Sequence, residues 1–351
     1  MFGRKGKSSN YAYTAARVKA KKAHLLAEDD YSKMLMMTPQ EISRYISEAG
    51  YTKEMTDLAN RESGLNLLEH ATYANMANVF GSILLASTGG LYDMVSAYLT
   101  KWDNWNLKVV LRGKSYGLDA DGIREDLVPA GILGAESLEK LVSLEADDDI
   151  LAAFGRMTHI TFPQDVLAAY KARSNLAEIE DYLDKRYYAH LLEVIRPTDR
   201  PSLIFRDYVA KEVDIRNFET ILKLKLDGVR GEPVMKYIIP GGKQIDAKLA
   251  LQLASAETVE EALSEIAQIG FYEDIKDSLD PKAATIREAV MGMRKYEMRQ
   301  AKKFSHLYPL SVIPVLDYMI HKENEVNNIR AVARGAESGL DRDVVKGLLV
   351  I

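Results

Sequence analysis

Three stretches of this sequence place an acid, an asparagine and a base at the same spacing, and these residue types can do chemistry. A shift of 111 residues aligns 103–113 (DNWNLKVVLRG), 214–224 (DIRNFETILKL) and 325–335 (EVNNIRAVARG) without a gap. A carboxylate can move a proton, an amide can hold an oxyanion and a cation can bind an anion. The aligned residues are the acids Asp103, Asp214 and Glu325, the amides Asn106, Asn217 and Asn328, the bases Arg112, Lys223 and Arg334, and the glycines Gly117, Gly228 and Gly339.

An active-site interpretation would require three equivalent sites, and no nucleophile or metal-binding pattern accompanies them. The six histidines contain no HExxH spacing, and the sequence has no cysteine. The fragments GRKGKS (3–8) and RGKS (112–115) lack the preceding glycine that a phosphate-binding loop needs. We therefore favour a structural use of the motif and expect no catalytic residues, no metal ion and no cofactor.

The aligned positions fit the end of a helix. Apolar residues four and seven positions after each acid fall on one stripe, which the asparagine borders. We expect this amide to be hydrogen-bonded, because an unpaired buried amide costs about 1–3 kcal/mol. The base lies on the solvent side near the helix C-terminus, and the glycine suits a left-handed position just past that end. A further acid then starts a short helix, which Pro129 and Pro240 end in the first two copies.

Apolar residues upstream of each acid also align, but they fall on the other side of the helical wheel. Met94 and Tyr98 are the examples from the first copy. Either the helix breaks near the acid or it is buried on two sides. We favour a break or kink, with the acid near the start of a second helix.

The rest of the chain also has helical periodicity. Segments such as 63–85, 174–195 and 257–269 repeat apolar residues at three- and four-residue steps, and convincing two-residue alternation is missing. The chain has 351 residues, and 47% of them are apolar. This length exceeds the size at which one hydrophobic core usually stops growing. We predict an all-α protein of two or three packed units.

Composition argues against several functions. A net charge of −5 disfavours a nucleic-acid-binding protein, and no apolar stretch is long enough to span a bilayer. The N-terminus lacks the apolar core of a signal peptide, so we expect a soluble protein that is not exported. Seven bases precede the first acid, Glu28, and we interpret them as a solvated arm and basic helix rather than as a docking patch for an acidic surface. These bases are Arg4, Lys5, Lys7, Arg17, Lys19, Lys21 and Lys22.

Several of these features together resemble a known family. They are YAYTAARVKAKKAHLL (11–26), the three acid-x-x-Asn-apolar motifs, IPGGKQ (239–244) and ENEVNNIRAVARGAESG (323–339). The chain is similar along its whole length to the C subunit of A-type (A/V-type) ATP synthases, which is related to the d subunit of V-ATPases. With the repeat, this predicts three similar multi-helix domains, 1–133, 134–244 and 245–351, in a pseudo-threefold, funnel-like arrangement.

The resemblance also implies a function. Members of this family are non-catalytic rotor subunits that couple the central shaft, subunits D and F, to the membrane proteolipid ring. They lie on the cytoplasmic side of the membrane as peripheral proteins. The bases Arg112, Lys223 and Arg334 are then candidate contacts with the shaft or the ring, against the simpler expectation of helix-end cations in solvent. The competing hypotheses are a free helical scaffold for soluble partners and an unrecognised helical enzyme.

Overall fold

The structure is a computed structural model, and it describes residues 8–173, 176–195, 199–267, 272 and 286–351. Within these residues all regular secondary structure is helical and no strand is present, which confirms the predicted all-α class. The chain divides into two compact units, Met1–Leu183 with Tyr318–Ile351, and Asp184–Asp317.

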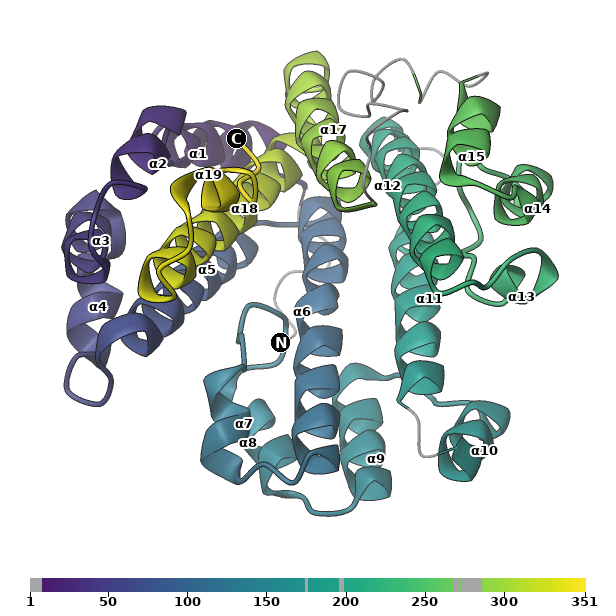
Figure 1. The fold of residues 1–351 in the computed structure, drawn as a ribbon, viewed down its shortest axis with the longest axis horizontal. Helices are drawn as coiled ribbons and strands as arrows, with labels where there is room; N and C mark the ends of the chain where they lie inside the picture. The colour runs from purple at the N-terminus through teal and green to yellow at the C-terminus, as the bar shows by residue number, and fades with distance from the viewer. Residues whose placement is uncertain (1–7, 174–175, 196–198, 268–271, 273–285) are drawn as a thin grey trace. The chain divides into compact units, whose positions relative to one another are not determined.

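The first unit contains helices from both ends of the sequence (Figure 1). Its helices, two of which continue into the other unit, are α1 (Tyr11–Lys22), α2 (Glu28–Met34), α3 (Pro39–Ile46), the π-helical turn η1 (Ser47–Tyr51), α4 (Thr52–Leu58), α5 (Gly64–Ala86), α6 (Gly90–Ser115), α7 (Ala120–Glu125), α8 (Ala135–Ser143), α9 (Asp147–Thr158), α10 (Gln164–Arg173), α11 (Ala177–Glu193), α18 (Ile313–Glu337) and α19 (Arg342–Lys346).

The second unit contains the end of α11, the start of α18 and the helices between them. These are α12 (Arg200–Leu226), α13 (Glu232–Met235), α14 (Ala247–Ser255), α15 (Val259–Ile266) and α17 (Ile286–Leu307).

Among the described residues, three hydrophobic cores each contain part of a motif-bearing helix. One core, in the first unit, contains residues from each of the helices α6 through α11, such as Leu107 and Phe154. Another core, in the second unit, surrounds Phe218 and contains residues from α12, α13, α14, α15 and α17. The third joins α2 to α5 with α18 and α19, and includes Ile42 and Ile329. Each core therefore combines a motif-bearing helix, the short helix that follows it and several further helices.

The third core is formed from the two ends of the sequence. Figure 1 shows the yellow helices α18 and α19 beside the purple N-terminal helices that complete this core. The contiguous ranges 1–133, 134–244 and 245–351 stay a prediction about where repeats begin. The packed cores draw on different ranges, because the N-terminal helices pack with the C-terminal ones.

The expected break at the motif acid is wrong. Helices α6, α12 and α18 each run without interruption through the acid and the asparagine. The alternative holds, since apolar residues on both sides of the wheel are buried, as Met94 at 1% exposure and Leu107 at 0% illustrate. Such a helix can continue without a break because partners on two faces bury both of its apolar stripes.

The predicted end of each motif helix is confirmed. Gly117, Gly228 and Gly339 have φ values of +71°, +75° and +62°, a region that glycine enters without steric cost. The next amide folds back onto the helix in every copy, as in Leu118 N–H to Gly113 C=O at 2.9 Å. This is the Schellman arrangement, which satisfies carbonyls left open at a helix end. Further acids then lie in the first turns of α7, α13 and α19, as expected.

Candidate functional site

Each motif asparagine binds the backbone of a residue 22 positions later. Its side-chain NH2 group donates one hydrogen bond, and its side-chain oxygen accepts another. Asn106 donates to the Val128 carbonyl at 2.8 Å and accepts from the Val128 N–H at 2.8 Å. The equivalent pairs are Asn217 with Ile239, at 2.8 and 2.8 Å, and Asn328 with Val350, at 2.9 and 3.1 Å. The three side chains are 0–3% exposed. The predicted hydrogen bonding is confirmed, and it fixes the segment that returns from the short helix onto the long one.

The motif acids of the first two copies hold a second returning segment. Asp103 accepts hydrogen bonds from the N–H groups of Ile132 at 3.0 Å and Leu133 at 2.9 Å. The equivalent Asp214 accepts three, from Lys243 at 3.1 Å, Gln244 at 2.9 Å and Ile245 at 2.9 Å. Both acids are 1% exposed, so they lie inside the protein. This burial was not among the expectations from the sequence.

Glycines bring the backbone close to these carboxylates. A Cβ atom at Gly131 would lie 2.1 Å from an oxygen of Asp103, and one at Gly242 would lie 2.4 Å from an oxygen of Asp214. A Cβ atom at either position would clash with the carboxylate, so the loop or the carboxylate would have to move. A glycine 28 positions after the acid in both copies is the sequence signal that could have revealed the contact.

In the third copy the acid binds the N-terminal part of the chain. Glu325 accepts from the Leu26 N–H at 2.6 Å, the Tyr51 hydroxyl at 2.6 Å and the Lys322 ammonium at 2.8 Å. The Lys322 ammonium also donates to the Tyr51 hydroxyl at 2.8 Å. The longer glutamate thus reaches a segment 299 residues away in sequence, where the other copies use the loop that follows them.

Burial shapes the electrostatics of these acids. It raises the pKa of Asp103 from 3.8 to about 6, even though the two backbone N–H groups act to lower it. The pKa of Asp214 is raised for the same reason. Burial lowers the pKa of the Lys322 ammonium, against the attraction of Glu325, and burial and Glu325 together raise the pKa of Tyr51 well above its ordinary value.

The bases of the first and third copies form ion pairs within the first unit. Arg112 binds Glu180 of α11 with two hydrogen bonds of 2.8 and 2.7 Å. Arg334 binds Glu69 of α5 through two hydrogen bonds, one of them 2.7 Å long. Glu69 and Glu180 are themselves 111 positions apart, so the two pairs are equivalent. Neither partner was identified from the sequence.

The second copy lacks this pair. Lys223 is 59% exposed and lies 3.9 Å from Glu219 on its own helix. The position that corresponds to Glu69 and Glu180 is Met291, which offers no charge. Among the three bases, Lys223 therefore has the weakest ion pair in the part of the chain that the structure describes.

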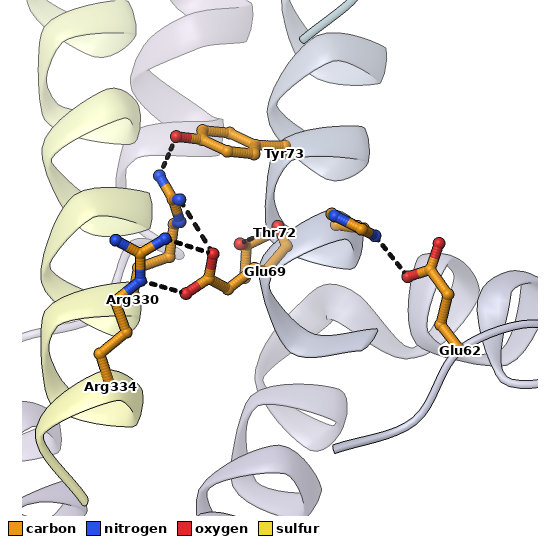
Figure 2. Close-up of polar contacts among 7 residues, drawn as sticks. Glu62, Glu69, Thr72, Tyr73, Arg330 and Arg334 are labelled. Carbon is orange, nitrogen blue, oxygen red and sulfur yellow. Dashed lines mark hydrogen bonds and ion pairs between the residues drawn. The ribbon is translucent and has the colours of Figure 1, made fainter. Parts of the chain in front are cut away.

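The pair at Glu69 is the more elaborate of the two. Figure 2 shows the Glu69 carboxylate facing Arg330 and Arg334 of the opposite helix, with Tyr73 beside Arg330. Arg330 donates to Glu69 at 2.9 Å and also to the Tyr73 hydroxyl, and its guanidinium lies 4.1 Å from the centre of the Tyr73 ring. The side chains of Glu69 and Arg330 are 12% and 15% exposed, so most of this contact is shielded from water.

The motif residues do not form a catalytic arrangement. The asparagines, Asp103 and Asp214 are engaged with backbone groups, and Glu325 is engaged with one backbone N–H and two side chains. The bases lie on another face and are half exposed. Among the described residues, no group of three or more His, Cys, Asp or Glu side chains could hold a metal ion. The geometry instead fixes loops to long helices and one helix to another. The proposed role of the bases in partner contacts stays a prediction.

Comparison with known proteins gives a consistent result over the whole chain. A family model described as "ATP synthase (C/AC39) subunit" matches residues 14–348. Proteins named as the C subunit of A-type ATP synthase are similar to this chain. The example from Methanococcoides burtonii is 34% identical over 99% of this chain and 96% of its own length. The one from Methanosarcina mazei is 34% identical over 98% and 94%, and the one from Halobacterium salinarum is 32% identical over 98% of each chain.

Replacing the motif asparagines tests their structural role. Asn106→Ala, Asn217→Ala and Asn328→Ala should each lower the free energy of unfolding by about 2–4 kcal/mol, because a buried N–H and a buried C=O lose their partner. Asn327→Ala, at the exposed neighbour of Asn328, is the control and should change it by less than about 0.5 kcal/mol. Urea unfolding measures both. A motif variant as stable as the control would contradict the assignment.

The raised pKa of Asp103 predicts a pH dependence. The folded protein keeps a proton on this carboxyl at higher pH than the unfolded chain does. The wild type should therefore lose stability relative to Asp103→Asn as the pH rises from about 4 to about 6, by up to about 3 kcal/mol. Urea unfolding of both proteins at several pH values measures the difference. A difference that is constant, or that grows in favour of the wild type, would rule the prediction out.

The two equivalent ion pairs should differ in strength. Glu69→Gln should cost about 2 kcal/mol at pH 7, because it leaves the shielded Arg330 without its carboxylate. Glu180→Gln, at the more exposed pair, should cost less than about 1 kcal/mol. Double-mutant cycles that combine Glu69→Gln with Arg330→Gln, and Glu180→Gln with Arg112→Gln, measure the two couplings. Equal coupling energies would show that burial does not make one ion pair stronger than the other.

The Glu69 pair should also depend on pH. Burial acts to raise the pKa of Glu69, but the hydrogen bonds from Arg334 and Arg330 outweigh it and lower the pKa below its ordinary value of 4.5. The stabilisation should therefore be present above pH 4.5 and disappear as the pH falls below it. The cost of Glu69→Gln, measured by unfolding at pH 7 and pH 3, should shrink at the lower pH.

Proposed function

The chain belongs to the ATP synthase (C/AC39) subunit family, and from this premise we propose that it is the non-catalytic central-stalk subunit that couples the shaft of an A-type ATP synthase to its membrane ring. In this role it binds shaft subunits D and F on one side and the proteolipid ring on the other. Torque passing through it links ATP synthesis or hydrolysis to proton or sodium transport.

The observation that carries the proposal is similarity along the full length of the chain. The relatives that bear the name of this ATP synthase component align over nearly all of this sequence and of their own. The family is that of a complex subunit, so the chain is assigned as a component of the complex rather than as an enzyme in its own right.

The packing of the chain suits a part that transmits force. Close-packed helices deform little under load, and the described cores contain large, fully buried side chains such as Tyr51, Phe154 and Phe218. The asparagine and acid contacts fix the loops to the long helices with hydrogen bonds rather than leaving them free. A coupling element needs this stiffness because deformation within the subunit would reduce the torque that it transmits.

The location follows from the same proposal. No described helix combines the length and the apolar composition needed to cross a bilayer. A subunit that meets the ring without entering the membrane would be peripheral, on the cytoplasmic side.

The three bases differ as candidate contacts. Arg112 and Arg334 already bind Glu180 and Glu69 within the chain. Lys223 has only the 3.9 Å contact with Glu219. Among the three, Lys223 is the preferred candidate for an ion pair with the shaft or the ring.

Removal and replacement of the subunit tests the proposal. A complex purified without this chain should still hydrolyse ATP in its catalytic head but should not drive ion transport, and adding the chain back should restore transport. The tagged chain should co-purify with subunits D and F and the proteolipid. Recovery with soluble proteins alone would favour a free scaffold, and turnover by the isolated chain would favour an enzyme; either result would overturn the proposal.

The Lys223 contact needs its own comparison. Lys223→Ala should reduce coupled transport several-fold in the restored complex, because one cross-subunit ion pair would be lost. Lys248→Ala, at an exposed lysine of α14, is the matched control and should leave transport unchanged. Equal transport with both variants would eliminate Lys223 as a contact.

A further inference from the structure

Helix α1 carries cations without carboxylate partners. Of its four bases, Arg17, Lys19 and Lys21 form no ion pair with any residue that the structure describes, and Arg17 donates only to the Tyr13 hydroxyl at 3.3 Å. Many cations elsewhere on the surface are paired, as Arg124 is with Glu139. The sequence contains no acid before Glu28, although the whole chain has a net charge of −5. These three positive charges of α1 therefore have no carboxylate partner among the residues that the structure describes.

The helix is fixed to the first unit by one face. Thr14, Ala15 and Val18 are 0–5% exposed and form this buried face. At its start, the Asn10 side chain donates to the Ala86 carbonyl at 2.8 Å and accepts from the Thr88 N–H at 3.0 Å, which ties α1 to the end of α5. Lys19 is exposed, and Arg17 and Lys21 are partly exposed, so these cations lie on a rigid element rather than on a free arm.

The outward face of α1 is lined mainly by small side chains and carries one aromatic residue. Ala12, Ala16 and Ala20 are exposed along it, with Lys19 among them, and Tyr13 is 59% exposed. Small residues let a helix approach a flat surface closely, and tyrosine is favoured where an apolar layer meets a polar one. Charges spread along a helix suit an extended anionic surface better than a single bound ion.

We propose that α1 binds the anionic phospholipid headgroups of a bilayer surface. Each lysine or arginine near such a surface contributes about 1 kcal/mol, so three unpaired cations are enough for measurable association. The lipid assignment rests on the proposed function, which puts the chain beside a membrane ring. Three more bases, Arg4, Lys5 and Lys7, precede α1 in sequence but lie outside the described residues.

Vesicle binding by the full chain tests this inference. The wild type should co-sediment with vesicles made of equal parts phosphatidylglycerol and phosphatidylcholine, and not with pure phosphatidylcholine. Raising the salt to about 0.5 M should release it, because exposed charges are then screened. The triple variant Arg17→Gln, Lys19→Gln, Lys21→Gln should bind at least about tenfold more weakly. Glutamine keeps the helix propensity of the residues it replaces.

A matched variant controls for the change in net charge. Lys53→Gln, Arg61→Gln and Lys140→Gln together remove the same number of positive charges from exposed sites away from α1, and this variant should bind like the wild type. Circular dichroism melting should show that both triple variants are folded. The salt dependence of the wild type needs no variant and tests the electrostatic basis separately.

Three results would overturn the inference. They are no binding to the anionic vesicles, equal binding to both vesicle types, and equal binding by the two triple variants. If the chain fails to bind vesicles yet co-purifies with the ring and requires the α1 cations to do so, the partner of α1 is an acidic protein surface and not lipid. In that case the coupling function would stand and the lipid inference would fall.

Discussion

A buried asparagine that pairs with the backbone 22 residues later is the contact on which the three cores depend. A segment leaving a short helix has N–H and C=O groups that no helix or sheet satisfies. The amide supplies both a donor and an acceptor, so one side chain satisfies both groups. The left-handed glycine ends the long helix at the same position in each copy. It therefore sets the distance between the asparagine and the backbone segment to which it binds. The carboxylate one turn earlier then binds the next loop in the first two copies.

The third core depends on a contact between distant parts of the chain. Glu325 reaches Leu26 and Tyr51, which are 299 and 274 residues away in sequence. The N-terminal helices therefore take the place that the following segment occupies in the other two cores. The ion pairs fit this pattern, since Arg112 binds a later helix, whereas Arg334 binds the early helix α5. Their carboxylate partners stand at equivalent positions.

Much of the fold could be predicted from the sequence, because it depends on local rules. Helical periodicity, the left-handed glycines and the need of Asn106 for a partner all follow from single segments. The predicted break near Asp103 was wrong because periodicity locates apolar stripes but cannot say how many neighbours cover them. The burial of Asp103 and the partners of Arg112 and Arg334 depend on segments far away in sequence. Only the recurring glycine at Gly131 and Gly242 gave a local hint of the buried acids.

The joining of the two ends of the sequence in one core has a consequence for chain order. If the chain began at α6 and continued from α19 into α1, each core would be formed by consecutive helices. Such a circular permutant would replace the long loop closure at Glu325 by a short one, which reduces the conformational entropy lost in forming that core. New termini in the turn at Gly89 and Gly90 would lie between cores rather than within one. The order of helices in this polypeptide is thus separable from the architecture that they build.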